Sequence, residues 1–161
     1  MDTIYGRNLQ EARRVAEAQL TAFPVNSTST LVALVVPTGA GKVRIEKISW
    51  VATAVLSDAD GTMLVTATAR DKSEAADDVL VSAASVEGGV ANESADFTLE
   101  ADGTEKIFTL EEGDSVRVAF TNNSAAIDTN GAISVFITYF PVPNFSAPQT
   151  DVVLAPSAYV A

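Results

Sequence analysis

The chain has 161 residues, about one domain, and a formal net charge of −11. It contains no histidine and no cysteine, which excludes cysteine nucleophiles, histidine-based acid–base triads and zinc sites built from these residues. So acidic a surface repels nucleic acid and anionic lipid, and we expect neither as a partner. No apolar stretch has the roughly 20 residues that a membrane-spanning helix needs, and the first residues lack a signal pattern. We expect a soluble protein made in a cytoplasm.

Residues 8–22 carry the pattern of an amphipathic helix. Pro24 ends this predicted helix, because the residue before a proline disfavours the α region. The narrow, alanine-rich apolar stripe leaves two interpretations open: packing on its own domain, or an arm that reaches a neighbouring subunit. The stripe recurs at spacings of three and four residues and consists of Tyr5, Leu9, Ala12, Ala16, Leu20 and Phe23.

A polar linker is predicted over residues 25–30, and beyond it the apolar pattern takes the period of strands. Residues 31–36 are apolar on both faces, which predicts a strand that is covered on both sides. The next residues contain Gly-Ala-Gly-Lys, as part of a phosphate-binding loop would. However, Val36 stands where that loop requires its first glycine, and Val43 where it requires serine or threonine. We therefore expect no nucleotide at this turn.

Residues 42–70 are predicted to form a long hairpin. Two runs of alternating apolar residues flank Asp58-Ala59-Asp60-Gly61, and Asp-Gly between such runs is a strong hairpin signal. The first run is apolar on both parities, with Val43 and Ile45 on one and Ile48 and Trp50 on the other. A second sheet of the same chain is the expected cover for the additional apolar face.

Further strands are predicted over residues 79–86, 96–100, 105–110, 115–121 and 132–140. The second and third of these form a predicted hairpin across residues 101–104. Short connections rich in Gly, Asp and Asn favour antiparallel pairing, since parallel strands need crossover helices. We predict an all-β fold: an antiparallel, jelly-roll-like β-sandwich of about eight strands, with a short N-terminal helix and an extended C-terminal arm.

Residues 141–161 differ from the sandwich. Their four prolines forbid a helix and disfavour a central strand, yet apolar residues remain frequent. Two interpretations stay open: an extended arm on another surface, or a segment that packs back on its own sandwich. The predicted organisation is a helical arm over residues 1–24, a β-sandwich domain over 25–140 and a C-terminal arm over 141–161.

Several acidic residues fall near predicted turns, and their oxygens are potential calcium ligands. The alternating acids of an EF-hand, which end in a bidentate glutamate, are absent. Asp-x-Asp-Gly is also what a tight turn prefers, so we expect no metal site. The residues in question are Asp58, Asp60, Asp71, Asp77 and Asp78.

Carboxylate pairs are the one catalytic device that remains without histidine and cysteine. Glu111, Glu112 and Asp114 are candidates for a glycosidase acid and base. In so acidic a chain such pairs arise by chance, and we expect no catalytic residue and no cofactor. Trp50 is either a stacking platform for a carbohydrate or, as is commoner in sandwiches, a core residue.

The whole pattern resembles the capsid cement, or decoration, proteins of tailed phages, which are jelly-roll structural proteins of the head. The resemblance covers residues 31–140, and the terminal arms match in character. The residues that carry it are Val43-Arg44-Ile45-Glu46-Lys47-Ile48-Ser49-Trp50-Val51, Leu56-Ser57-Asp58-Ala59-Asp60-Gly61-Thr62 and Leu110-Glu111-Glu112-Gly113-Asp114-Ser115-Val116.

This resemblance implies a non-enzymatic virion protein on the capsid surface, commonly a homotrimer, that clamps neighbouring subunits of the major capsid protein. The competing hypothesis is a non-catalytic carbohydrate- or receptor-binding module of a phage fibre, which would need an exposed aromatic platform. We expect intersubunit or capsid contacts from apolar residues of both arms and of the last strand: Leu9, Leu20, Phe23, Phe136, Phe140, Phe145, Val152, Leu154 and Tyr159.

Overall fold

The computed structural model describes residues 13–57, 62–73, 77–100, 108–123 and 131–142. These ranges contain nine strands and no helix. The strands are β1 (Arg14–Leu20), β2 (Ser27–Val35), β3 (Lys42–Ala52), β4 (Met63–Arg70), β5 (Asp77–Ser85), β6 (Ser94–Asp96), β7 (Phe108–Leu110), β8 (Ser115–Asn122) and β9 (Ile133–Val142).

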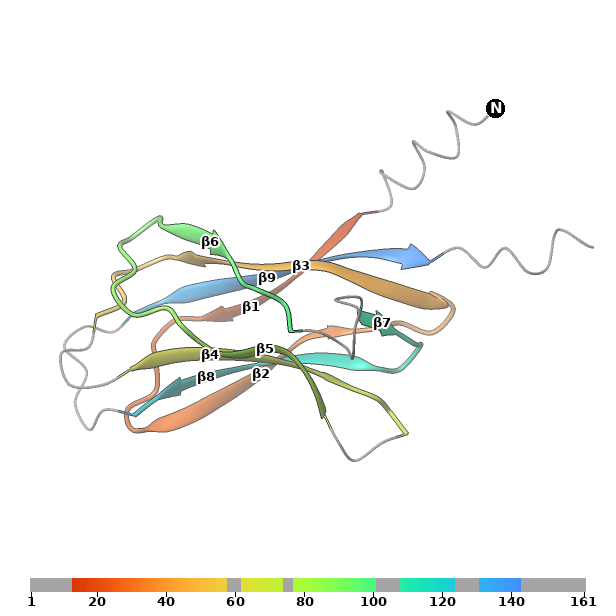
Figure 1. Cartoon of the computed structure of the whole chain (residues 1–161), viewed down its shortest axis with the longest axis horizontal. Helices are drawn as coiled ribbons and strands as arrows, with labels where there is room; N and C mark the ends of the chain where they lie inside the picture. Colours follow the sequence, from red (N-terminus) through yellow and green to blue (C-terminus); the bar gives the residue numbers. More distant parts are fainter. Residues whose placement is uncertain (1–12, 58–61, 74–76, 101–107, 124–130, 143–161) are drawn as a thin grey trace, which may run out of the picture.

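Two antiparallel sheets pack face to face (Figure 1). One sheet has the order β1-β9-β3-β6, with β7 also paired with β3, and the other has the order β2-β8-β4-β5. Most consecutive strands lie in opposite sheets, which is the alternation expected of a jelly roll. The prediction of an all-β fold with two antiparallel sheets is confirmed.

The predicted N-terminal helix is wrong for the residues that the structure describes. Residues 14–20 form β1, which pairs with β9 from Arg14 opposite Tyr139 to Leu20 opposite Ile133. Ala18 and Leu20 are buried and the residues beside them are exposed, so the period is two. Spacings of four fit a helix and also every second position of a strand, and pairing with β9 overrides the helix propensity of alanine. Residues 8–12 lie outside the described residues.

The predicted hairpin over residues 42–70 is also wrong, although both of its strands exist. β3 lies between β9 and β6 in one sheet, whereas β4 lies between β8 and β5 in the other. The connection therefore crosses between sheets; its expected turn, residues 58–61, lies outside the described residues. Alternation identifies each strand but not its partner, and a connection of this length easily spans the ~10 Å between two sheets.

The predicted hairpin over residues 96–110 fails for a similar reason. β6 and β7 each pair with β3 rather than with one another: β6 lies opposite the second half of β3 and β7 opposite the first half. Residues 97–100, which were expected to be strand, are not, and residues 101–107 lie outside the described part of the chain. Two short strands thus share one edge of β3.

The strand β2 is not covered on both sides by the described residues. It begins at Ser27, inside the predicted linker, and is an edge strand that pairs with β8. Val32 and Val35 are 56% and 55% exposed, whereas Leu34 is buried. A β-bulge between Val32 and Leu34 separates the two exposed valines by three positions.

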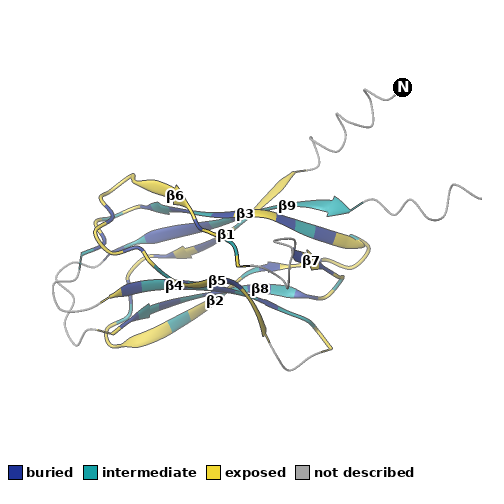
Figure 2. Ribbon diagram, in the orientation of Figure 1, coloured by how far each residue is buried: buried dark blue, intermediate teal, exposed yellow. Residues whose placement is uncertain are grey.

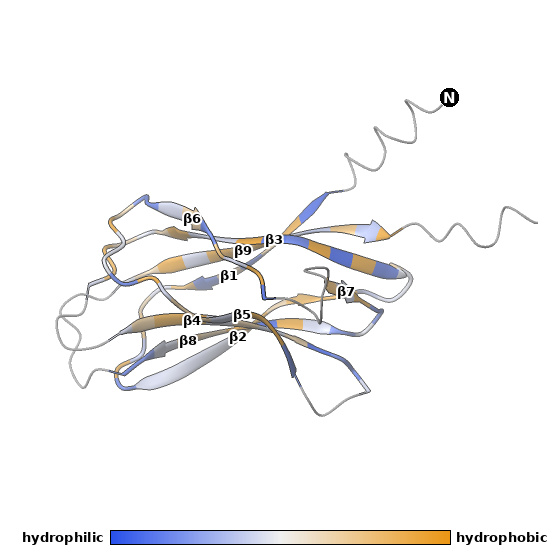
Figure 3. Ribbon diagram, viewed as in Figure 1, coloured by the Kyte–Doolittle hydropathy of each residue, from blue (hydrophilic) through white to orange (hydrophobic). Residues whose placement is uncertain are grey.

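A β-bulge in β3 explains why this strand is apolar on both parities. The register against β9 shifts between Ile45 and Lys47, where Glu46 is the additional residue. Val43 and Ile45 before the bulge and Ile48 after it are all buried, on the same side of the sheet. Figure 3 shows the alternation of hydrophobic and hydrophilic residues at the start of β3. The second apolar face that the sequence indicated is therefore the same face.

The core fills the space between the sheets, where most residues of the central strands are buried (Figure 2). Phe120 on β8 meets Phe23 edge to face, with ring centroids 5.9 Å apart. The backbone N–H of Phe23 donates to the carbonyl of Gly131 at 3.0 Å, so the chain after β1 is anchored to the core. Fully buried side chains include Phe120, Ile48, Leu56, Met63, Leu80, Ile133 and Ile137.

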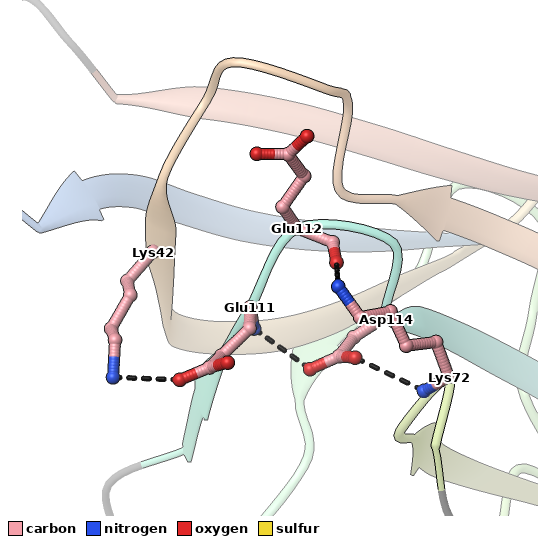
Figure 4. A network of polar contacts seen from close by, with 5 residues as sticks. All are labelled: Lys42, Lys72, Glu111, Glu112 and Asp114. Atoms are coloured by element: carbon pink, nitrogen blue, oxygen red, sulfur yellow. Dashed lines mark hydrogen bonds and ion pairs between the residues drawn. The ribbon is translucent and has the colours of Figure 1, made fainter.

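A buried carboxylate holds the turn between β7 and β8 (Figure 4). Asp114 is 5% exposed, and its carboxylate accepts hydrogen bonds from the backbone N–H groups of Glu111 at 2.7 Å and Lys72 at 3.1 Å. The Lys72 ammonium donates to the Glu112 carbonyl at 2.6 Å. The chain just after β4 is thereby tied to the turn before β8.

We expect Asp114→Ala to lower the free energy of unfolding by about 2 kcal/mol, because two backbone donors lose their buried acceptor. Asp114→Asn keeps one acceptor oxygen and should cost less. Chemical denaturation of the two variants and the parent checks the order. Equal stability of Asp114→Ala and the parent would mean that water replaces the carboxylate without cost.

Candidate interaction surface

The outer side of the β1–β9–β3–β6 sheet carries two partly exposed aromatic residues of β9. Val135 and Ile137 point into the core and are fully buried, so Phe136 and Phe140, on the other parity, point outward and are partly exposed. The surface, called here the Phe136 face, is formed by the outward residues of four strands: Val15, Glu17, Arg44, Lys47, Ser49, Val51, Asp96, Phe136, Thr138 and Phe140.

Strand register fixes the neighbours of the two phenylalanines. Phe136 lies opposite Glu17 of β1 and Ser49 of β3. Phe140 lies opposite Arg44, whose guanidinium carbon is 5.9 Å from the centroid of the Phe140 ring, within the range of a cation–π contact. Each aromatic ring is therefore bordered by polar groups, an arrangement typical of protein–protein contacts.

Ion pairs near this surface balance its charge. Arg13 donates to Glu46, the bulged residue of β3, at 2.6 Å, and Lys47 lies 3.4 Å from Asp96. These pairs are exposed and contribute little to stability. They leave a nearly neutral surface on a chain whose net charge is −11, so this face repels an acidic partner less than the rest of the surface does.

Two shallow depressions lie on the same side of the sheet. One of about 340 Å³ is lined by Phe140, Arg44, Arg13, Ile45 and Glu46. Hollows beside partly exposed aromatic rings receive protruding apolar side chains of a partner better than a flat sheet does. The second depression, of about 400 Å³, is lined by Lys47, Ser49, Trp50, Val51, Ser94, Ala95 and Asp96.

The structure separates the contact residues predicted from the sequence. Leu20 and Phe23 are buried in the sandwich itself, whereas Phe136 and Phe140 lie on the Phe136 face. Arg44, which the sequence analysis did not select, joins them; its alternation with buried Val43 and Ile45 was the available signal. Five predicted contacts lie outside the described residues: Leu9, Phe145, Val152, Leu154 and Tyr159.

Two of the acidic candidates, Asp71 and Asp77, have structural partners. Asp71 accepts hydrogen bonds from the backbone N–H and hydroxyl of Ser73, at 2.6 Å and 2.7 Å, and these bonds lower its pKa. Asp77 lies 3.7 Å from Arg70. The part of the chain that the structure describes contains no cluster of three or more His, Cys, Asp or Glu residues suited to a metal ion. Asp58 and Asp60 lie outside it.

Glu111, a candidate acid catalyst, is paired with a lysine. The Lys42 ammonium lies 2.7 Å from its carboxylate, and this hydrogen bond and charge lower the pKa of Glu111 and raise the pKa of Lys42. A lowered pKa keeps the carboxylate ionised, which is the opposite of what a general acid needs.

Among the described residues, no helix is both long and apolar enough to cross a membrane.

Trp50 is a core residue and offers no stacking platform. Its side chain is buried, and its ring lies 6.5 Å from that of Phe97 in a tilted arrangement. Of the two interpretations of this tryptophan, burial is confirmed.

Comparison with solved structures finds the same architecture in phage heads. A chain of the cyanophage Pam1 capsid asymmetric unit matches with a TM-score of 0.52 and 20% identity, over 81% of this chain and 85% of that chain. A chain of the capsid of Ralstonia phage GP4 matches with a TM-score of 0.50 and 15% identity, over 82% and 86%. This protein shares their fold. The resemblance to phage head proteins is thus confirmed at the level of fold. No protein-family model and no curated protein matches the sequence.

Proposed function

We infer that the protein is a non-enzymatic structural component of a phage virion, which binds the outside of the capsid and stabilises it by clamping neighbouring capsid subunits. The observation that carries this proposal is the fold that it shares, over most of both chains, with chains of two phage capsids. The partner is the major capsid protein, and the protein acts as a homotrimer on the capsid surface.

The Phe136 face is the part of the sandwich best suited to contact the capsid. Phe136 and Phe140 supply apolar area at the centre, and Arg44 and Lys47 supply polar groups around them. Aromatic and arginine side chains dominate binding energy at protein interfaces. A clamp requires contact area rather than chemistry, and several weak contacts on one lattice reinforce each other.

The terminal segments extend this surface in the proposal. β1 belongs to the sandwich although it lies within the first 24 residues, and β9 continues to Val142. The segments proposed as arms are therefore residues 1–12 and 143–161. In the C-terminal segment Phe145, Val152, Leu154 and Tyr159 provide apolar side chains for a neighbouring subunit.

The double variant Phe136→Ser, Phe140→Ser tests the contact surface. We expect it to fold normally, because both rings lie outside the core, and to occupy the capsid at least about tenfold less at equal concentration. Occupancy is measured by sedimenting capsids that lack the protein after incubation with each variant. Leu64→Ser, on the outer side of the other sheet, is the matched control and should bind as the parent does.

Two outcomes would contradict the proposal in different ways. Equal occupancy of the double variant and the control would remove the Phe136 face as the contact while leaving a virion role intact. Absence of the protein from purified virions, examined by electron microscopy and mass spectrometry, would refute the structural role itself.

A further inference from the structure

The edge strand β2 differs from the other edges of the two sheets. Its sequence, Ser-Thr-Ser-Thr-Leu-Val-Ala-Leu-Val, contains no charged residue and no proline over nine positions. In the described part of the chain it pairs with β8 alone, so one row of its backbone N–H and C=O groups faces outward. Long, uncharged edge strands are templates for the addition of another strand.

The remaining edges carry the features that prevent such pairing. β1 carries Arg14 and Glu17, and β6 and β7 have three residues each. β5 begins with two aspartates, has two register shifts against β4 and contains Ala83 at a φ of 33°. Among the described strands, protection of every edge except β2 indicates that β2 is kept available for a strand from elsewhere.

The strand β2 carries two exposed valines. Val32 and Val35 are 56% and 55% exposed and lie on the outer side of their sheet. β1 and β2 are the edge strands of the two sheets and contact each other. Figure 2 shows β2 mostly in the colours of exposed and intermediate residues. Exposed apolar side chains on an unpaired edge strand indicate a contact site.

The chain itself contains a segment suited to this edge. Residues 149–155, Gln-Thr-Asp-Val-Val-Leu-Ala, lie between Pro148 and Pro156 and contain no proline. Seven residues are a usual strand length, and each can donate and accept backbone hydrogen bonds. Val152, Val153 and Leu154 have high strand propensity or apolar area. In a strand Val153 points to one face and Val152 and Leu154 to the other, so one of these faces can pack beside Val32 and Val35.

The direction and reach of this segment also fit. Val142 pairs with Lys42, and residues 36–41 join Lys42 to the end of β2, so β9 and β2 end at the same end of the sandwich (Figure 1). A segment that leaves from this end and follows β2 runs antiparallel to it. Residues 143–148 span up to about 20 Å when extended, which exceeds the ~10 Å between sheets and leaves room to reach an adjacent molecule.

We propose that residues 149–155 of a second copy of this chain add to the free edge of β2 as an antiparallel strand. A second copy is favoured because the proposed function places the chain in a homotrimer. Each copy then donates a segment to the next, and the ring closes as a trimer. This proposal rests on the trimer of the proposed function and specifies its contact.

Cross-linking tests the proposal on a favourable background, because the chain has no cysteine. Thr30→Cys on β2 and Val153→Cys are co-expressed as separate chains and treated with a short bis-maleimide. We expect a cross-linked dimer from this pair. Ser82→Cys on β5, the exposed opposite edge of the same sheet, replaces Thr30→Cys in the control and should give no dimer.

Other outcomes overturn the proposal. If the double variant Thr30→Cys, Val153→Cys forms cross-links only within single chains, the segment at the β2 edge belongs to the same chain. If neither arrangement gives a cross-link, residues 149–155 do not bind at the β2 edge. Val153→Pro should convert the trimer to monomer in light scattering, whereas Ser157→Pro, outside the segment, should not. These experiments contain no capsid, so their failure is distinct from failure of the capsid-binding proposal.

Discussion

Deletion of residues 143–161 is expected to reduce capsid occupancy at least about tenfold and to leave a sandwich that still folds cooperatively. All nine described strands end by Val142, so the deletion removes no described strand pairing and no described core residue. The loss of binding follows from multivalency: when one of several linked contacts is removed, avidity falls by far more than the energy of that contact suggests.

The cut must follow Val142 and not Phe140. Pro141 and Val142 pair with Val43 and Lys42 at the start of β3, and a shorter chain would leave that end of β3 unpaired. Capsid sedimentation and differential scanning calorimetry on the same preparation check both halves of the expectation. Unchanged occupancy would refute a role for the C-terminal segment, and loss of cooperative unfolding would show that the sandwich does not fold without it.

Phe120→Ala is expected to destabilise the protein by about 3–5 kcal/mol, the largest effect of any single substitution proposed for the sandwich. Phe120 is fully buried on β8, a central strand, and its ring meets Phe23 edge to face. Truncation leaves a cavity between the sheets and removes the contact that anchors the chain after β1. Unfolding in urea, followed by the fluorescence of Trp50, measures the change.

Phe136→Ala is the matched control for this substitution. It removes the same atoms from the outer side of β9, where the ring is partly exposed, and we expect a loss below about 1 kcal/mol. The two variants should therefore have opposite phenotypes: Phe120→Ala lowers stability, and Phe136→Ala lowers capsid binding. Similar losses of stability would mean that the outer aromatic ring belongs to the core.

The sequence predicted strands better than it predicted their partners. β8 follows from its alternation, because the large apolar residues Val116, Val118 and Phe120 lie between small or polar neighbours. The pairing of the strands could not be predicted in this way, since a turn signal between two strands fits both a hairpin and a connection that crosses between sheets. The bulge at Glu46 did leave a signal, because apolar residues change parity between Ile45 and Ile48. The same change of parity also fits a strand with two apolar faces, so the sequence alone did not identify the bulge.

The candidate surface was predictable in part. Phe136 and Phe140 follow from their parity on β9, opposite buried Val135 and Ile137. Leu20 and Phe23 are predicted to make the same kind of contact because a helix is expected there. Leu20 ends β1 and Phe23 follows three residues later, and both are core residues. The exposed side of β2 required the strand order, which depends on pairings between residues far apart in the sequence.

The position of β9 has a consequence for how the protein is made. It is the last of the described strands in the sequence, yet it lies between β1 and β3, and Arg14 pairs with Tyr139. During synthesis β1 and β3 therefore lack the strand that pairs with both of them until β9 has left the ribosome. Such distant pairing makes folding slow. The Phe136 face therefore forms only when the sandwich is complete, so a partly synthesised chain lacks the surface proposed to bind the capsid.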